Sequence, residues 1–214
     1  MYLLFLKNKF IIILYMPLLF KKSNGDTVIK GSTAIAKYVT PLPSLFTSNT
    51  LTISGQPSGN GVYTISTSGN YDSITSDLAS YNAFNGLKTG PTWVSGNGNS
   101  NGSRVVNISG LGNIVGDWIQ IQIPYSLVLG HYSIFPWTAN NGGAKTWYVV
   151  GSNDGTTWYQ LDYQHLSSRL NSVDLTYFSV TNSVSYSYFK IIITEYAGNG
   201  FYSFASLSQF NIGT

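Results

Sequence analysis

The chain contains no cysteine among its 214 residues, and histidine occurs only as His131 and His165. The absence of cysteine excludes a disulfide scaffold, a thiolate metal site and a cysteine nucleophile. Two histidines leave almost no material for a histidine-rich metal site.

Charge is also scarce: 9% of the residues are charged, whereas roughly 25% is usual. So few charges argue against a helical bundle or a coiled coil, and the 43% hydrophobic content excludes a disordered acidic or basic tail. Residues 1–59 carry a net charge of +5 and residues 60–214 carry −2. The basic excess therefore lies outside the main domain, which argues against nucleic acid as a partner.

A long hydrophobic run is missing as well. The uninterrupted apolar stretch runs from Phe10 to Phe20, 11 residues, and a spanning helix needs about 20. Extending the stretch toward the N-terminus would bury Lys7 and Lys9, at roughly 2.5–3.5 kcal/mol each near mid-membrane.

Three interpretations of residues 1–22 stay open. They form an anchor to a membrane or an assembly, or a signal peptide, or the chain starts at Met16 instead of Met1. The signal-peptide interpretation has a basic start and a suitable apolar segment. Its small-residue triplet, Ala34–Ala36, comes 14 residues after Phe20, too far for cleavage.

The residues that are plentiful favour an all-β domain. Gly, Ser, Asn and Thr make up 88 residues, and aromatic residues add 15%. This mixture is typical of β-strands separated by many polar turns, and the length suits one large domain with a full core. Residues 23–59 resemble a linker, in which residues 27–36 could pair as a strand.

From Gly61 onward, period-two segments alternate with turns, which predicts a β-sandwich or barrel. Ile119, Ile121 and Ile123 share one face of a strand, and Gln120 and Gln122 share the other. The expected strands are Val62–Ser66, Trp118–Ile123, His131–Phe135, Thr146–Val150, Thr157–Leu161, Leu175–Val180, Tyr188–Thr194 and Leu207–Ile212. About eight antiparallel strands fit a jelly-roll β-sandwich, with one short helix around residues 77–84.

Several segments, in this order and spacing, resemble one known family. They are Ala83–Gly86, Trp93, Gly116–Ile121, Trp147–Trp158, Tyr188–Ile193 and Ala205–Phe210. Together they resemble the discoidin family, also called the coagulation factor 5/8 C-terminal-type domain, a galactose-binding-like jelly roll similar to family 32 carbohydrate-binding modules. The resemblance covers residues 43–214 and leaves residues 1–42 as an N-terminal arm.

The resemblance implies non-catalytic binding of glycans, lipid surfaces or proteins by loops at one end of the sandwich. Residues 45–54 and the segment from Gly59 to Tyr63 also resemble versions of this module in virion proteins of large DNA viruses. The leading hypothesis is therefore a minor capsid or virion-surface protein that contacts capsid proteins, with its arm on a membrane, shell or partner. The alternative is a carbohydrate-binding lectin or adhesin that is secreted or attached to the cell surface.

Many members of the family hold a structural Ca²⁺ ion through two carboxylates. At those positions this chain has Asn85 and Gln209, which offer carbonyl oxygens but no charge. Because Ca²⁺ usually takes several oxygen ligands with negative charge, calcium is disfavoured here and no cofactor is expected.

No catalytic pair stands out. A glycosidase needs two carboxylates at the scissile bond, and the seven carboxylates of residues 60–214 show no pairing in sequence. We therefore expect a non-enzyme, with a hydrolase as the least favoured alternative.

The candidate ligand-binding residues are aromatic rings and amides in loops. Rings stack on the apolar faces of sugars while amides bind the hydroxyl groups. The candidates are Trp137, Asn140, Asn141, Tyr71, Phe201 and Tyr202. Trp93, Trp118, Trp147 and Trp158 are expected in the core or on the sheet surface instead.

Overall fold

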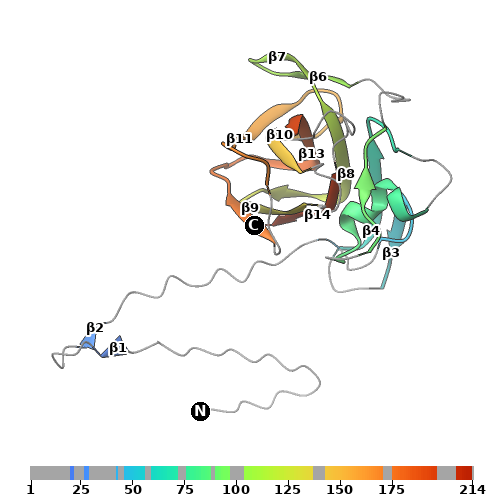
Figure 1. Ribbon diagram of the computed structural model, residues 1–214. Coiled ribbons are helices and arrows are strands. Elements are labelled where there is room, and N and C mark those ends of the chain that lie inside the picture. The colour runs from blue at the N-terminus through green and yellow to red at the C-terminus, as the bar shows by residue number, and fades with distance from the viewer. Residues whose placement is uncertain are drawn as a thin grey trace. The chain divides into compact units, whose positions relative to one another are not determined.

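The structure, a computed structural model, describes residues 20–21, 27–28, 42, 46–55, 59–71, 76–87, 90–96, 104–136, 143–170, 175–196 and 206–213 (Figure 1). The chain divides into two units, Met1–Tyr38 and Val39–Thr214. In the first unit, β1 (Phe20–Lys21) pairs antiparallel with β2 (Thr27–Val28). Within the described residues, no helix has the length and hydrophobicity that crossing a membrane requires.

The second unit contains a six-stranded antiparallel sheet, which we call the large sheet. Its strands lie in the order β11-β10-β13-β8-β4-β3. Their bounds are β3 Thr50–Ile53, β4 Gly61–Thr67, β8 Asp117–Val128, β10 Ala144–Ser152, β11 Tyr159–His165 and β13 Ser185–Tyr196. The two longest strands, β8 and β13, pair at its centre.

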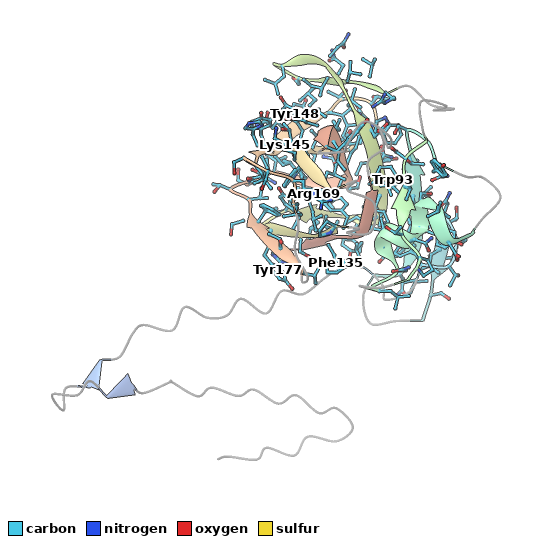
Figure 2. All side chains as sticks on the ribbon, viewed as in Figure 1. Trp93, Phe135, Lys145, Tyr148, Arg169 and Tyr177 are labelled. Atoms are coloured by element: carbon cyan, nitrogen blue, oxygen red, sulfur yellow. The ribbon has the colours of Figure 1, made fainter. Side chains whose placement is uncertain are left out.

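A four-stranded sheet, the small sheet, covers one face of the large sheet. Its order is β12-β9-β14-β5, with bounds β5 Trp93–Val94, β9 His131–Pro136, β12 Thr176–Ser179 and β14 Ser206–Gly213. Side chains of the two sheets meet between them (Figure 2). The unit is therefore a jelly-roll β-sandwich, which confirms the predicted fold class.

The core follows from the alternation of side chains along the central strands. Ile119, Ile121 and Ile123 of β8 are fully buried between the sheets, beside Trp147 of β10 and Ile191 of β13. Gln120 and Gln122 are half-buried on the opposite face. Side chains in a strand point to opposite faces in turn, so the period-two pattern places the apolar set inward.

A short hairpin lies outside the two sheets. It consists of β6 (Val105–Ile108) and β7 (Gly112–Val115), and it leads directly into β8 (Figure 1). Its turn contains Gly110 and Gly112, both with positive φ, a backbone conformation that glycine adopts at little cost. Sequence periodicity missed β7 as a strand because the turn-rich segment shows no alternation of apolar residues.

The predicted short helix is present as two 3₁₀ helices, η1 (Ser76–Leu78) and η2 (Ser80–Phe84). The described residues of the unit form twelve strands rather than about eight, since β3, β5, β6 and β7 are short additions. Of the strand expected at residues 27–36, the structure describes Thr27 and Val28 only. Leu42, placed in the arm by the sequence, packs against the core of the second unit.

The strand predicted at residues 157–161 begins later, at Tyr159. The Asp154 carboxylate accepts hydrogen bonds from the backbone N–H groups of Thr156 (2.8 Å) and Thr157 (2.7 Å), which extends the turn through these residues. These hydrogen bonds hold the pKa of Asp154 well below its usual range. Asp154 thus stabilises the turn before β11.

Candidate functional site

Many strands of both sheets end or begin at the same end of the sandwich, which we call the loop end. In the large sheet, Ala144 at the start of β10 pairs with Tyr196 at the end of β13. In the small sheet, Pro136 at the end of β9 pairs with Leu207 of β14. The chain crosses between the sheets from residue 136 to 144 and again from 196 to 206, so both crossings start and finish at this end.

Of the predicted ligand-binding residues, the structure describes Tyr71. Its side chain is 46% exposed, and its backbone N–H donates to the carbonyl oxygen of Val94 at 2.9 Å. Val94 itself pairs with Ser206, so Tyr71 is held at the loop end. The other five candidates lie outside the described residues. In the sequence, Trp137, Asn140 and Asn141 come between β9 and β10, and Phe201 and Tyr202 come between β13 and β14.

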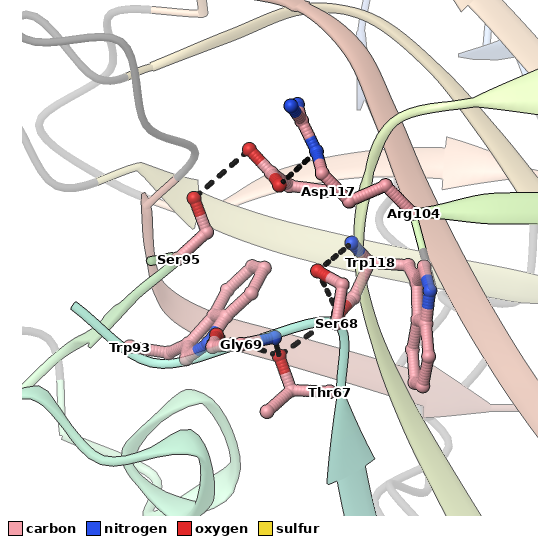
Figure 3. A network of polar contacts seen from close by, with 8 residues as sticks. All are labelled: Thr67, Ser68, Gly69, Trp93, Ser95, Arg104, Asp117 and Trp118. Carbon is pink, nitrogen blue, oxygen red and sulfur yellow. Dashed lines mark hydrogen bonds and ion pairs between the residues drawn. The ribbon is translucent and has the colours of Figure 1, made fainter. Parts of the chain in front are cut away.

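A network of polar contacts fixes the backbone before Tyr71 (Figure 3). The Ser68 backbone N–H donates to the Trp118 carbonyl oxygen at 2.9 Å, and the Trp118 N–H donates to the Ser68 hydroxyl at 3.0 Å. The hydroxyl of Thr67 also donates to the Trp118 carbonyl, at 2.9 Å. These bonds fasten the exit of β4 to the first residues of β8.

Trp93 supports the same segment from the small sheet. Its indole is fully buried, and its Nε1–H donates to the carbonyl oxygen of Gly69 at 3.3 Å (Figure 3). The buried ring needs such a partner for its polar atom. Trp93 therefore has a structural role, as the sequence predicts.

A buried ion pair joins the hairpin to the two sheets at the loop end. Asp117 is 1% exposed, and one of its oxygens lies 2.8 Å from Nε of Arg104. Its other oxygen accepts a hydrogen bond from the Ser95 hydroxyl at 2.9 Å (Figure 3). Burial, and next the charge of Asp117, raises the pKa of the nearby Tyr196. The carboxylate of Asp117 in β8 thus connects the segments that contain Arg104 and Ser95. The sequence did not predict this role, because Arg104 and Asp117 lie on opposite sides of a hairpin.

A second charged cluster lies where β10, β11 and β13 meet the loop end. Lys145 Nζ donates to one Glu195 oxygen, and Thr146 Oγ1 donates to the other at 2.8 Å. His165 Nδ1 lies 2.8 Å from the same Thr146 oxygen. The hydrogen bonds that Glu195 accepts from Lys145 and then from Thr146 lower the pKa of Glu195. The negative charge of Glu195 is thus paired with the positive charge of Lys145.

Asn70 contributes a buried polar atom at the loop end. The side-chain oxygen of Asn70 is buried and accepts no hydrogen bond from any described residue. Buried acceptors are nearly always satisfied in folded proteins. Asn70 directly precedes Tyr71, so an acceptor and an exposed ring adjoin here.

Of the two calcium candidates, the structure describes the side chain of Asn85. Asn85, the residue after η2, is buried. Its Oδ1 accepts from the Leu87 backbone N–H at 2.8 Å, and its Nδ2 donates to Asn82 Oδ1 at 3.4 Å. Gln209 pairs through its backbone with Phe135, and its side chain lies outside the described atoms. Among the described residues, no three His, Asp or Glu side chains could share a metal ion. The expectation that calcium is disfavoured stays a prediction.

Four carboxylates among the described residues have structural partners. Asp117 and Glu195 pair with cations, Asp154 stabilises a turn, and Asp162 accepts a hydrogen bond from the Tyr132 hydroxyl at 2.5 Å. Burial, and next this bond, raises the pKa of Tyr132. Asp77 is exposed, while Asp72 and Asp174 lie outside the described residues. None of these contacts pairs two carboxylates.

The fold has relatives among solved structures, although no family model and no curated protein matches the chain. A CBM32 module from Clostridium perfringens, solved with GalNAc-β-1,3-galactose, is 14% identical with a TM-score of 0.53, over 71% of this chain and 95% of that one. CBM32-3 from a family 31 glycoside hydrolase of the same organism is 14% identical with a TM-score of 0.54, over 69% and 87%. The C-terminal domain of a chitobiase from Bacteroides fragilis is 18% identical with a TM-score of 0.52, over 71% and 93%. These likenesses confirm the galactose-binding-like jelly-roll fold that the sequence resembles.

Proposed function

We propose that the chain is a non-catalytic carbohydrate-binding protein whose site is the loop end of the sandwich. One observation supports the proposal: Tyr71 and the strand ends at Pro136, Ala144, Tyr196 and Ser206 lie at one end of this fold. A solved neighbour with the same fold was obtained with GalNAc-β-1,3-galactose. Glycans with galactose or GalNAc are therefore the first ligands to test.

The described part of the loop end offers a surface on which a neutral sugar can stack. The ring of Tyr71 is exposed, and it directly follows Asn70, whose side-chain oxygen is buried. The contacts around Ser68 and Trp93 hold this segment on two sheets. A held segment loses little conformational freedom on binding, which favours affinity.

A glycan array probed with the full chain, with and without Ca²⁺, tests the proposal. We expect selective binding of galactose- or GalNAc-terminated glycans, weakened at least about tenfold in Tyr71→Ala and in Trp137→Ala, which corresponds to about 1.4 kcal/mol. Tyr177→Ala is the matched control, because Tyr177 is 49% exposed on β12. A folded chain that binds no glycan, or equal losses in Tyr71→Ala and Tyr177→Ala, would contradict the proposal.

The role in a virus particle, with capsid proteins as partners, rests on the sequence resemblance alone and stays a prediction. The same holds for an arm that attaches residues 1–22 to a membrane. Deleting residues 1–38, the first unit, is the direct test, because incorporation into particles should then fail while glycan binding persists.

A further inference from the structure

The face of the large sheet that points away from the small sheet, which we call the outer face, has two different halves. The hairpin covers one half: Val106 and Ile108 pack against Val150, Trp158 and Ile192 in a second apolar cluster. The hairpin is fastened there by the Ser109 N–H, which donates to the Trp158 carbonyl oxygen at 2.8 Å. This half is closed to a ligand.

The other half, which we call the open half, consists of Thr64 and Ser66 of β4 and Gln120 and Gln122 of β8. All four side chains are half-buried, and they alternate with core residues such as Ile65. Pairing places Ser66 opposite Gln120 and Thr64 opposite Gln122. The result is a regular array of hydroxyl and amide groups without a carboxylate, held by the backbone of two paired strands.

Lys190 of β13 lies at the border of the two halves, paired with Gln120 on one side and Val150 on the other. It is 5% exposed. Its ammonium lies 4.1 Å from the ring centroid of Trp118 and 3.9 Å from that of Trp158. Cation–π contacts of this kind stabilise a desolvated ammonium.

Among the residues that the structure describes, no acceptor binds the ammonium of Lys190. None of the ion pairs or hydrogen bonds among the described residues includes it. An ammonium has three N–H donors, and rings satisfy its charge but not its donors. Burial lowers the pKa of Lys190 to about 8, so the group is still mostly charged at pH 7. A buried cation of this kind attracts an anion more strongly than an exposed one does.

We propose that the open half is a second binding surface, separate from the loop end, for a polysaccharide in which a uronic acid alternates with a neutral sugar. The uronate carboxylate accepts from the Lys190 ammonium, and the neutral sugar donates to and accepts from Gln120, Gln122, Thr64 and Ser66. One ammonium beside an array of neutral groups matches one carboxylate per neutral sugar. The half-buried Trp118 beside Lys190 adds an aromatic edge.

Hyaluronan, which has one carboxylate per disaccharide, and its carboxyl-reduced form are the probes for the full chain. We expect hyaluronan to bind at least about tenfold more tightly than the reduced polymer, with affinity falling as salt rises because salt screens the charge pair. Gln120→Glu places a carboxylate of nearly the same shape opposite Lys190 and should weaken hyaluronan binding at least about tenfold. Gln160→Glu is the control, since Gln160 is exposed and pairs with Val150 on the far side of the same row. It should change affinity less than about twofold.

Several results would overturn the proposal. Equal affinity for the two polymers, or no binding of hyaluronan by a chain that binds neutral glycans, would exclude a uronate site. Equal losses in Gln120→Glu and Gln160→Glu would show general charge repulsion. Loss of hyaluronan binding in Tyr71→Ala, with Gln120→Glu unaffected, would place the polymer at the loop end instead. The neutral-glycan array tests the loop end separately, so the two proposals can fail independently.

Discussion

At the loop end, Arg104 and Lys145 each pair with a carboxylate, whereas Lys190 on the outer face lies between two indole rings. The two regions belong to the same large sheet and are both partly buried. In the first, the carboxylates remove the need for an outside partner. In the second, no carboxylate among the described residues pairs with the cation. The charges at the loop end therefore stabilise the fold, whereas the charge of Lys190 is the one that the proposed anionic ligand would neutralise.

The difference has a physical basis in what each cation stabilises. Asp117 fastens Arg104 and Ser95, which belong to segments on different sheets. Lys190 instead lies in the middle of β13, where backbone pairing on both sides already holds the strand. Its side chain is not needed to position the chain, so its loss should affect binding more than folding.

Removing the carboxylate that pairs with a loop-end cation should have the largest effect on the free energy of unfolding. Asp117→Ala leaves Arg104 without its counter-charge and the Ser95 hydroxyl without its acceptor, and makes this region resemble the surroundings of Lys190. We expect the free energy of unfolding to fall by about 3 kcal/mol, since breaking a buried pair typically costs 3–5 kcal/mol and Arg104 is partly exposed. Urea unfolding followed by tryptophan fluorescence measures the change.

The control for this prediction is Asp77→Ala. Asp77 is exposed on η1, and exposed substitutions usually change stability by less than about 0.5 kcal/mol. A loss in Asp117→Ala as small as that of the control would mean that the ion pair does not hold the loop end.

The lowered pKa of Lys190 should make the free energy of unfolding depend on pH. Its pKa is about 8 in the folded chain, against a usual value of 10.5, so between these values the unfolded chain binds more protons. Stability therefore rises with pH in this window, by about 2 kcal/mol between pH 7.5 and 9.5. Above about pH 10 the trend reverses, because burial raises the pKa of Tyr125 and Tyr132 and their unfolded forms lose protons first.

Urea unfolding at pH 7.5 and pH 9.5 checks this prediction. Lys190→Met should abolish the rise, whereas Lys145→Met should retain it, because the Lys145 ammonium pairs with Glu195. If wild type and Lys190→Met show the same rise, another group is responsible.

The sequence predicted most of the fold, but it predicted little of the difference between the loop-end cations and Lys190. Alternation in residues 118–123 predicted β8, because burial of one face imposes a period of two, and the apolar, β-branched residues of 188–194 predicted β13. Neither pattern could show that Trp118 and Trp158, 72 and 32 residues earlier in the chain, would lie on either side of Lys190. Strand register decides such contacts.

The candidate site shows a similar division. Polar, glycine-rich segments marked the loops, and Tyr71 proved to be an exposed ring at the loop end. The pairs Ala144–Tyr196 and Pro136–Leu207 bring together the strand ends before and after residues 137–142 and 197–205. No local sequence pattern indicates these pairs. The Arg104–Asp117 pair was also hidden, because its two members flank a hairpin that closes by its own turn.

The smallest effect should come from giving Lys190 the kind of partner that the loop-end cations have. Gln120→Glu places a carboxylate directly opposite Lys190 on the neighbouring strand. Opposite charges in such a cross-strand pair contribute roughly 0.2–1 kcal/mol, so we expect the free energy of unfolding at pH 7 to increase by about 0.5 kcal/mol. The new charge should also raise the pKa of Lys190 toward its usual value, so the stability gain between pH 7.5 and 9.5 should shrink. Gln160→Glu should leave both quantities unchanged. If instead Gln120→Glu is destabilised and keeps the full pH dependence, the ammonium is out of reach of a carboxylate at that position, and the face is closed to anionic ligands as well.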